Sequence, residues 1–466
     1  MMGRRVMAEP LFYRFRIEDH VPEDHLLRVV DQLLDTAFVR KVMAPFYSPI
    51  GRPSIDPELM VRMLLIGYLN GIRSERRLCA EVHLNLAYRW FCRLGLEGSV
   101  PDHSTFSKNR HGRFREGDLF RRVFEHVVGE CMRAGLVGGE AFAIDASVIE
   151  ADASHNRKVD GKLTSWPEEE KITRPAREYI AALDQAMEAE AETIAAKRDD
   201  EPPGNRPSEP KVTSLTDPAA AWTSKGRMKV AFAYGINYLI DTAAAIIVDV
   251  AATPARWSAE VAATKTMLER VKERFGLQPQ RLAADAAYGS GLMISWLMRR
   301  DIEPHIPLLD RERQTKGLFT RSEFSYDAQA NVFTCPNGKL LTSRGKVRDD
   351  GTVSYWASTK DCRACPLKSR CTTGEKRIVT RNVFEAERER VRALLSTPAF
   401  ERSATERKKI EMRFAHLKRH LSFRRLRLRG TTGASDEFLL AAAAQNVRRL
   451  ASCLTEGWGM PSAQTV

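Results

Sequence analysis

The sequence lacks any apolar stretch long enough to cross a membrane. Its longest apolar runs, around Ala243–Ala252 and Leu439–Ala444, fall well short of the ~18 residues that a membrane helix requires. The opening residues, MMGRRVMAEPLFYRF, carry basic side chains but neither the apolar core nor the small-residue cleavage site of a secretory signal. We therefore expect a cytoplasmic protein with no membrane partner.

Internal repeats are absent and cysteines are few. Only eight of the 466 residues are cysteine, and four of the eight lie within Cys335–Cys371. Few cysteines in a long chain without a signal favour a reducing compartment over a disulfide scaffold. With 43% apolar and 29% charged residues, the chain has the composition of a globular protein of about three domains.

Basic residues outnumber acidic ones, 73 to 60, for a net charge of +13. This excess favours a polyanionic partner, because cationic side chains that neutralise phosphates release counterions. Residues 401–430 concentrate the excess, with eleven basic and three acidic side chains. The candidate DNA-binding residues of this segment are Arg407, Lys418, Arg424, Arg425, Arg427 and Arg429.

The pattern of apolar residues predicts an α/β fold whose mixed sheet is flanked by helices. Three hairpin-like strands, beginning near Ala141, precede two strands that alternate with helices. We predict four regions: a helical N-terminal domain at 1–130, the first part of the α/β domain at 131–310 with a charged linker insertion at 157–225, a cysteine-bearing insertion at 311–377, and a helical, basic C-terminal part at 378–466.

Residues 20–130 contain start signals for several short helices. Asp56 is a candidate N-cap before Pro57, and Ser74 and Ser104 are candidate caps of later helices. The segment Lys108–Arg115 is basic. It suits either DNA-end recognition or a solvated face of a packing or dimerisation domain.

Two acidic residues, Asp145 and Asp285, end short apolar strands. A carboxylate there is costly unless it is paired or binds a metal ion. Oxygen ligands suit Mg²⁺ or Mn²⁺, and two such ions can hold the attacking and leaving oxygens of a phosphoryl transfer. The alternative for either residue alone is an ordinary turn or helix-cap role.

A third acid, Glu411, lies in a basic helical stretch. Arg407, Glu411 and Lys418 are spaced by four and seven residues, which places them on one helical face. A carboxylate flanked by cations fits a metal ligand beside a bound phosphate backbone. A solvated helix with ion pairs between residues four apart explains the same pattern.

These three segments resemble the signatures of DDE transposases from bacterial insertion sequences. Arg407, Glu411 and Lys418 match the R-x3-E-x6-K part of the Y-x2-R-x3-E-x6-K box of that family. The segments IDASVIEADAS at Asp145 and ADAAYGS at Asp285 are similar to its two aspartate strands. The stretch from Pro53 to Arg110 is similar to the helical N-terminal domain of these enzymes.

The resemblance implies an RNase H-like catalytic domain in which Asp145, Asp285 and Glu411 bind two Mg²⁺ or Mn²⁺ ions. Such an enzyme nicks double-stranded DNA at the terminal repeats of the element and joins the 3′-hydroxyls to target DNA, as a homodimer near the bacterial nucleoid. Ala404 stands where the box has tyrosine, which leaves end processing open. A domesticated DNA-binding protein and a nuclease that cuts without joining are the alternatives.

Cys335, Cys362, Cys365 and Cys371 predict a structural zinc site. Four thiolates close a tetrahedral Zn²⁺ site, and an insertion this short buries too little apolar surface to fold alone. Similar cysteine-rich insertions occur in relatives of this transposase group. Four free thiols are the main alternative, and the spacing fits an iron–sulfur cluster poorly.

Overall fold

The computed structural model describes residues 15–51, 53–161, 173–183, 210–224, 229–308, 317–348 and 351–455. The chain forms two compact units. The first contains the N-terminal part to Leu136 together with His416–Phe423 and the C-terminal segment from Leu439. The second contains Val137–Ala415 and Arg424–Phe438.

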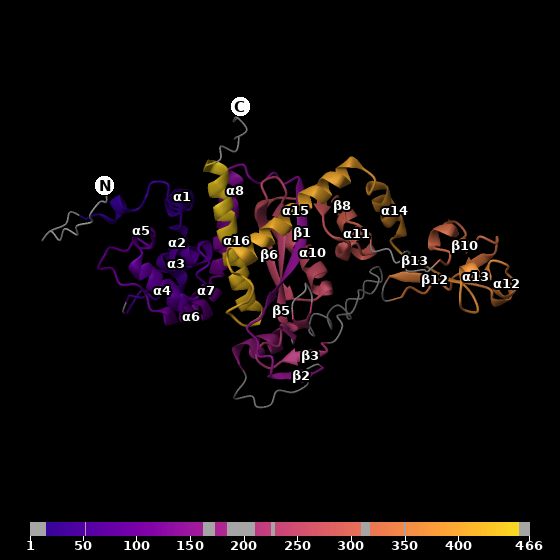
Figure 1. Cartoon of the computed structure of the whole chain (residues 1–466), viewed down its shortest axis with the longest axis horizontal. Coiled ribbons are helices and arrows are strands. Elements are labelled where there is room, and N and C mark those ends of the chain that lie inside the picture. The colour runs from indigo at the N-terminus through magenta and orange to yellow at the C-terminus, as the bar shows by residue number, and fades with distance from the viewer. Residues whose placement is uncertain are drawn as a thin grey trace, which may run out of the picture. The chain divides into compact units, whose positions relative to one another are not determined.

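The first unit is helical, as predicted (Figure 1). Asp56 caps α3 by accepting a hydrogen bond from Glu58 N, and Ser74 caps α4, both as expected. The cap of α6 is Asp102 rather than Ser104, because the Asp102 carboxylate accepts the Ser104 N–H and starts the helix two residues earlier than predicted. The helices are α1 Leu26–Leu33, α2 Phe38–Met43, α3 Pro57–Leu69, α4 Glu75–Leu84, α5 Leu86–Phe91, α6 His103–His111, α7 Arg113–Glu116 and α8 Leu119–Arg133.

The second unit is built on a mixed sheet with the order β6–β5–β1–β7–β8. The neighbours β6, β5 and β1 are antiparallel, whereas β1, β7 and β8 are parallel, and a short β4 also pairs with β5. Three antiparallel strands followed by two parallel strands form an RNase H-like sheet, which confirms the predicted fold class. The strands are β1 Ala141–Glu150, β4 Ala221–Thr223, β5 Ala231–Asp241, β6 Ile246–Pro254, β7 Arg281–Ala283 and β8 Glu303–His305.

Helices pack on both faces of this sheet. Phe142, Ile144 and Leu239 point to one face and join the core formed with α10 and α11. Side chains alternate along a strand, so Tyr238 points to the other face, where it stacks on Phe414 of α15. The helices of this unit are α10 Trp257–Phe275, α11 Gly291–Met298, α14 Glu385–Leu394, α15 Pro398–Arg419 and α16 Gly430–Thr455, the last two of which continue into the first unit.

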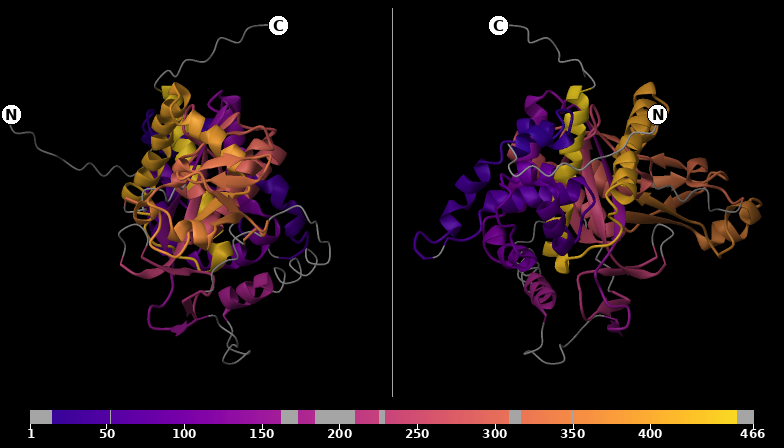
Figure 2. Two further views of the ribbon diagram at one scale, coloured as in Figure 1. Left: turned by 90° about the vertical axis from the view of Figure 1, so that its right-hand side faces the viewer. Right: turned by 60° about the vertical axis from the view of Figure 1, so that its left-hand side comes forward.

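The cysteine-bearing insertion folds around its own five-stranded antiparallel sheet, of order β13–β12–β11–β10–β9 (orange in Figure 2). Its small core contains Phe333, Leu341, Tyr355 and Val379. We call this part, residues 317–382, the cysteine module. Its elements are β9 Ser325–Asp327, β10 Val332–Thr334, β11 Leu340–Thr342, β12 Thr352–Ala357, α12 Thr359–Arg363, α13 Lys368–Cys371 and β13 Ile378–Asn382.

The region predicted as a linker, 157–225, contains structure at its two ends. Strands β2 (Lys158–Asp160) and β3 (Val212–Ser214) pair with each other, and β4 joins the main sheet. Most of the acidic, Pro-rich stretch between them lies outside the described residues. Within the described ranges, no helix is long and apolar enough to span a bilayer.

Candidate active site

Asp145 and Asp285 occupy equivalent positions relative to two neighbouring strands, Asp145 within β1 and Asp285 just after the end of β7. The parallel pairing of β1 with β7 ends at Ala143↔Ala283, and each aspartate lies two residues beyond this last pair. The prediction that Asp145 ends its strand is wrong. Asp145 lies in the middle of β1, which continues to Glu150 while paired with β5. The sheet opens on the β7 side at this point, which places the two carboxylates side by side at its edge.

The alternation of side chains sets the face on which these carboxylates lie. Ile144 and Ala284 belong to the core beneath α10 and α11, so Asp145 and Asp285 point to the opposite face. Asp145 pairs across the strands with Tyr238. Because Tyr238 stacks on Phe414, this is the face that α15 covers.

Asp145 has an electrostatic environment unlike that of a surface carboxylate. Its side chain is only 20% exposed, and its Oδ1 accepts a hydrogen bond of 2.8 Å from Ala146 N. Burial raises the pKa of Asp145 to about 6, and the negative charges of Asp285 and Glu411 contribute to the increase. The other two predicted acids are thus close enough to act on Asp145 electrostatically.

Helix α15 is held on the sheet by contacts around Glu411. Ile410 is fully buried, and the rings of Phe414 and Tyr238 stack with centroids 4.8 Å apart. On the same helix, Lys409 Nζ donates to the carbonyl of Thr242 at 2.5 Å and Arg413 Nε donates to that of Ala245 at 2.8 Å. These contacts fasten the helix to the β5–β6 turn and leave the Glu411 side chain 54% exposed.

Arg407 lies between two of the three carboxylates. Its Nη1 is 3.7 Å from Asp145 Oδ2, and its Nη2 is 3.1 Å from Glu411 Oε1. In the described part of the chain, no three His, Cys, Asp or Glu side chains are arranged to hold one metal ion. The three acids are therefore not gathered around one ion in this structure, and a guanidinium lies between two of them.

Asp285 and Glu411 also have the local roles that the sequence offered as alternatives to metal binding, a helix cap and an ion pair. Asp285 caps the short helix Ala286–Tyr288 by accepting a hydrogen bond of 2.8 Å from Ala287 N, and Glu411 makes the four-residue ion pair with Arg407. One oxygen of Asp285 accepts this bond, so its other oxygen can still bind a metal ion. These local roles are compatible with metal binding.

Two further polar groups next to the site were not predicted. The Tyr288 hydroxyl is buried with no hydrogen-bond partner among the described residues. Burial and then the charges of Asp145, Glu260 and Asp285 raise the pKa of Tyr288. Glu260 is itself a buried carboxylate, on the face of α10 that packs on the sheet. An acid near the start of an amphipathic helix gives no sequence signal of such a position.

The basic segment after α15 is attached to the far end of β1. Leu426 N donates to the Glu150 carbonyl at 2.7 Å, and Glu150 N donates to the Arg424 carbonyl at 3.1 Å. Five residues separate Glu150 from Asp145, or about 17 Å at ~3.3 Å per residue. The arginines of this segment thus lie about 17 Å along the strand from the carboxylates. Lys418 belongs to the first unit, and its assignment to the same DNA-binding surface remains a prediction.

The four arginines of this segment are exposed but differ in their partners. Arg429 pairs with Asp152 at 2.9 Å, and Arg425 approaches Asp152 and Glu150 at 3.3 and 3.8 Å. Arg427 makes no ion pair among the described residues. It is therefore the arginine of this segment best placed to neutralise a phosphate of bound DNA.

Replacing Arg427 by Gln should weaken DNA binding and lower the slope of log K against log salt by about 0.9, the value for one phosphate contact. Arg429→Gln is the matched comparison, and it should change the slope less because Arg429 already neutralises Asp152. Titration of labelled duplex at several salt concentrations measures both slopes. An unchanged slope for Arg427→Gln would remove this residue from the DNA surface.

The four cysteines of the module lie at one end of its sheet. Cys371 is buried, and burial raises the pKa of its thiol, with Cys362, Cys335 and Cys365 near enough to raise it further. Cys335 Sγ accepts a hydrogen bond of 3.3 Å from Lys339 N. These thiols are near one another, although no three have the arrangement of ligands around a single ion.

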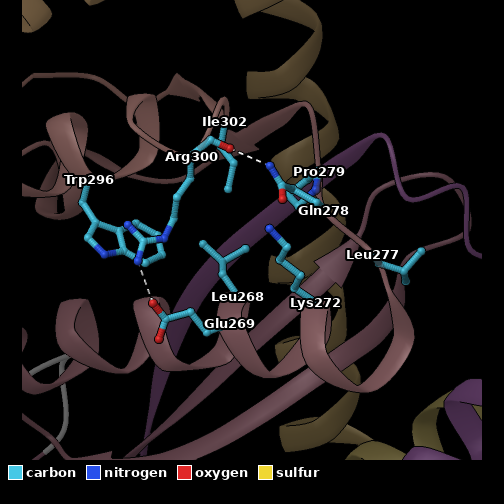
Figure 3. Close-up of a pocket in the computed structure, with 9 residues that line it drawn as sticks. All are labelled: Leu268, Glu269, Lys272, Leu277, Gln278, Pro279, Trp296, Arg300 and Ile302. Atoms are coloured by element: carbon cyan, nitrogen blue, oxygen red, sulfur yellow. Dashed lines mark hydrogen bonds and ion pairs between the residues drawn. The ribbon is translucent and has the colours of Figure 1, made fainter.

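A small hollow between α10 and α11 is lined by none of the three candidate metal-binding acids (Figure 3). Its volume is about 40 Å³, roughly the space of one water molecule. The Arg300 guanidinium stacks 3.9 Å above the Trp296 ring and pairs with Glu269 at 2.9 Å. These side chains use one another as partners, so the hollow is a packing feature and not a ligand site.

An RNase H-like sheet with acids on its open edge and on a covering helix defines a class of phosphoryl-transfer enzymes. Two family models match the chain: a transposase domain (DUF772) at residues 15–112 and a transposase DDE domain at residues 334–451. The second match includes Glu411 and all four cysteines of the module. Neither match covers half of the chain by itself, but together they support a DDE-type transposase of an insertion-sequence family, and with it DNA binding, DNA cutting and a general dependence on divalent metal ions.

Among solved structures, the chain is similar to a piggyBac transposase synaptic complex with hairpin DNA, determined by cryo-EM. The identity is 9%, the alignment covers 94% of this chain and 83% of the other, and the TM-score is 0.33. A likeness this weak carries no argument about the fold or the function.

Proposed function

We propose that the enzyme nicks DNA at the ends of its element and joins the resulting 3′-hydroxyls to target DNA, with Asp145, Asp285 and Glu411 as the metal-binding residues. The observation that carries this proposal is that Asp145 and Asp285 each lie two residues beyond the last pair of the parallel strands β1 and β7. Glu411 lies on the helix that covers the same face. Each step is a phosphoryl transfer: water attacks a phosphodiester at the end of the element and releases its 3′-hydroxyl, and this hydroxyl then attacks a phosphodiester of the target and displaces a target 3′-hydroxyl. Neither step needs a side-chain nucleophile.

The donor set fits Mg²⁺ or Mn²⁺. All three candidate ligands offer carboxylate oxygens, which these ions prefer. Burial is the main cause of the raised pKa of Asp145, and the charges of Asp285 and Glu411 add to it. A divalent cation would offset both effects. Two bound ions would activate the attacking water or hydroxyl and stabilise the leaving oxygen.

The protein supplies position and charge around the cleaved phosphodiester. The β1–β7 edge and the anchored α15 hold the carboxylates on a rigid frame, which limits reorganisation during the reaction. Arg407 must release at least one carboxylate for both to bind metal, and its guanidinium is then free to face a phosphate. The absence of tyrosine at position 404 removes one contact of the family box, so end processing is expected to rely on other groups.

Strand cleavage and joining on labelled DNA from the ends of the element test this proposal. The ends are identified as inverted repeats that flank the gene. Nicks with 3′-hydroxyls and joined products support a transposase, whereas nicks without joining indicate a nuclease. Binding without cleavage by the intact chain would indicate a domesticated DNA-binding protein. We propose a homodimer, because two ends must be held together, and mass measurement of the DNA complex tests this state.

We further propose that Cys335, Cys362, Cys365 and Cys371 bind one structural Zn²⁺. The thiols lie at one end of a small sheet, and thiolates are the preferred ligands of zinc in structural sites. The purified, reduced protein should therefore contain about one zinc per chain. Cys362→Ser should lower this content and loosen the cysteine module, as measured by protease sensitivity. Zinc far below one per chain, unchanged by the substitution, would show that the cysteines are free thiols.

A further inference from the structure

The cysteine module is strongly basic at the end of its sheet that carries the cysteines. Two turns at this end, residues 335–339 and 358–377, contain seven basic and two acidic side chains. Five of these cations are exposed, and three of them, Lys339, Lys360 and Arg363, lie at the end of the first turn and on α12. None of these three makes an ion pair with an acid in the described ranges.

The register of the strands brings these cations together. Leu341 of β11 pairs with Ala357 of β12, and Thr334 of β10 pairs with Leu340. The turn that ends in Lys339 therefore lies beside the start of α12, which carries Lys360 and Arg363. Their proximity agrees with that of the cysteines on the same two turns.

Helix α12 also borders an open hollow. The hollow is lined by Thr359, Lys360, Arg363 and Ala364 and has a volume of about 480 Å³. Two cationic side chains and a hydroxyl are donors that phosphate oxygens accept. Among the described residues that line this hollow there is no carboxylate, so these four side chains present no like charge to an anion.

We propose that the cysteine end of the module is a second DNA-binding surface, which holds the phosphate backbone of duplex DNA through Lys339, Lys360 and Arg363. The inference rests on the proposed function, because only a DNA-processing enzyme brings a long polyanion to this surface. The contacts are to phosphates, so the surface adds affinity and positions the duplex without reading its sequence.

The opposite end of the same sheet provides a matched control. Lys346 and Arg348 are exposed there, and Val347 pairs with Val353 near the start of β12. Val353 and Ala357 are four residues apart, or about 13 Å at ~3.3 Å per residue. The double variant Lys346→Gln/Arg348→Gln thus removes the same charge from the same module, away from the cysteine turns.

The test is salt-dependent binding of full-length protein to a labelled duplex in the absence of Mg²⁺. Lys360→Gln/Arg363→Gln should bind several-fold more weakly, and its salt slope should fall by about 1.8, which corresponds to two phosphate contacts. The control variant should keep a slope close to that of the wild type. Lys360→Arg/Arg363→Lys should restore binding, and unchanged melting temperatures would show that all variants fold.

An unchanged affinity and slope in Lys360→Gln/Arg363→Gln would overturn the inference, as would an equal loss in the control variant. Neither result would affect the proposed function, because cleavage of short terminal duplexes by the wild type tests that separately. Wild-type protein that fails to bind any duplex DNA would instead overturn the proposed function itself.

Discussion

Replacing Asp145 by Asn is expected to lower the rate of DNA strand cleavage by at least ~10³-fold, since even the hydrogen-bonding partners of a metal ligand typically cost about 10–100-fold when mutated. The amide keeps the size of the side chain but removes the charge that binds a divalent cation. DNA binding should change little, because phosphate contacts elsewhere supply the affinity. Cleavage and binding of the same labelled terminal duplex measure the two effects.

Asp160→Asn is the control for this substitution. Asp160 is an exposed carboxylate on β2 in the same unit, so the chemical change is identical but remote from the β1–β7 edge. This control variant should cleave at the wild-type rate. Wild-type cleavage by Asp145→Asn would remove Asp145 from the catalytic residues.

Replacing Phe414 by Ala is expected to destabilise the second unit by about 3–5 kcal/mol, the usual cost of removing a buried phenyl ring. The ring is 7% exposed and stacks on Tyr238 at an interplanar angle of 11°. Because this stack holds the Glu411 helix on the sheet, the folded fraction of the variant should also cleave DNA more slowly. Thermal or denaturant unfolding measures the loss of stability, and a cleavage assay measures the change in rate.

Two variants separate the stacking contact from a general effect on the helix. Phe414→Leu keeps much of the apolar volume and should cost less than Phe414→Ala. Met412 is 70% exposed on the same helix, so Met412→Ala should be close to neutral. Equal stability of Phe414→Ala and Met412→Ala would show that α15 is not held by this stack.

The three acids were proposed from the sequence, but the geometry around them could not be predicted from it. Asp145 was expected at a strand end because a carboxylate after a short apolar run is typical of a turn. In fact β1 continues past it, since β5 remains paired to β1 as far as Glu150 while β7 ends earlier. Where a neighbouring strand ends depends on tertiary pairing, and that information is absent from the local pattern of β1.

Helix caps show the same limit on a smaller scale. Asp56 and Ser74 were identified because each directly precedes a helical apolar pattern. Near Ser104 two residues, Asp102 and Ser104, had suitable side chains, and only the backbone conformation decided between them. The ion pair of Arg407 with Glu411, four residues away, was among the alternatives that the sequence offered. The approach of Arg407 to Asp145 could not be foreseen, because Asp145 is 262 positions away on another element.

The proximity of Lys339 to α12 is likewise a property of strand register. In the sequence, Lys339 and Lys360 are separated by a hairpin of unremarkable composition. Only the pairing of β11 with β12 brings their turns to one end of the sheet. The charge of the sequence indicated a polyanionic partner. The proposed DNA-binding surface of the cysteine module could be located only from the fold.

The central claim is that this chain cuts DNA by metal-dependent phosphoryl transfer at Asp145, Asp285 and Glu411. Its most direct test is cleavage of labelled terminal DNA by the wild-type protein with Mg²⁺ and with EDTA, beside the variant with all three acids changed to their amides. We predict nicks with free 3′-hydroxyls only for the wild-type protein with Mg²⁺. Cleavage in EDTA, or equal cleavage by the triple variant, would contradict the claim.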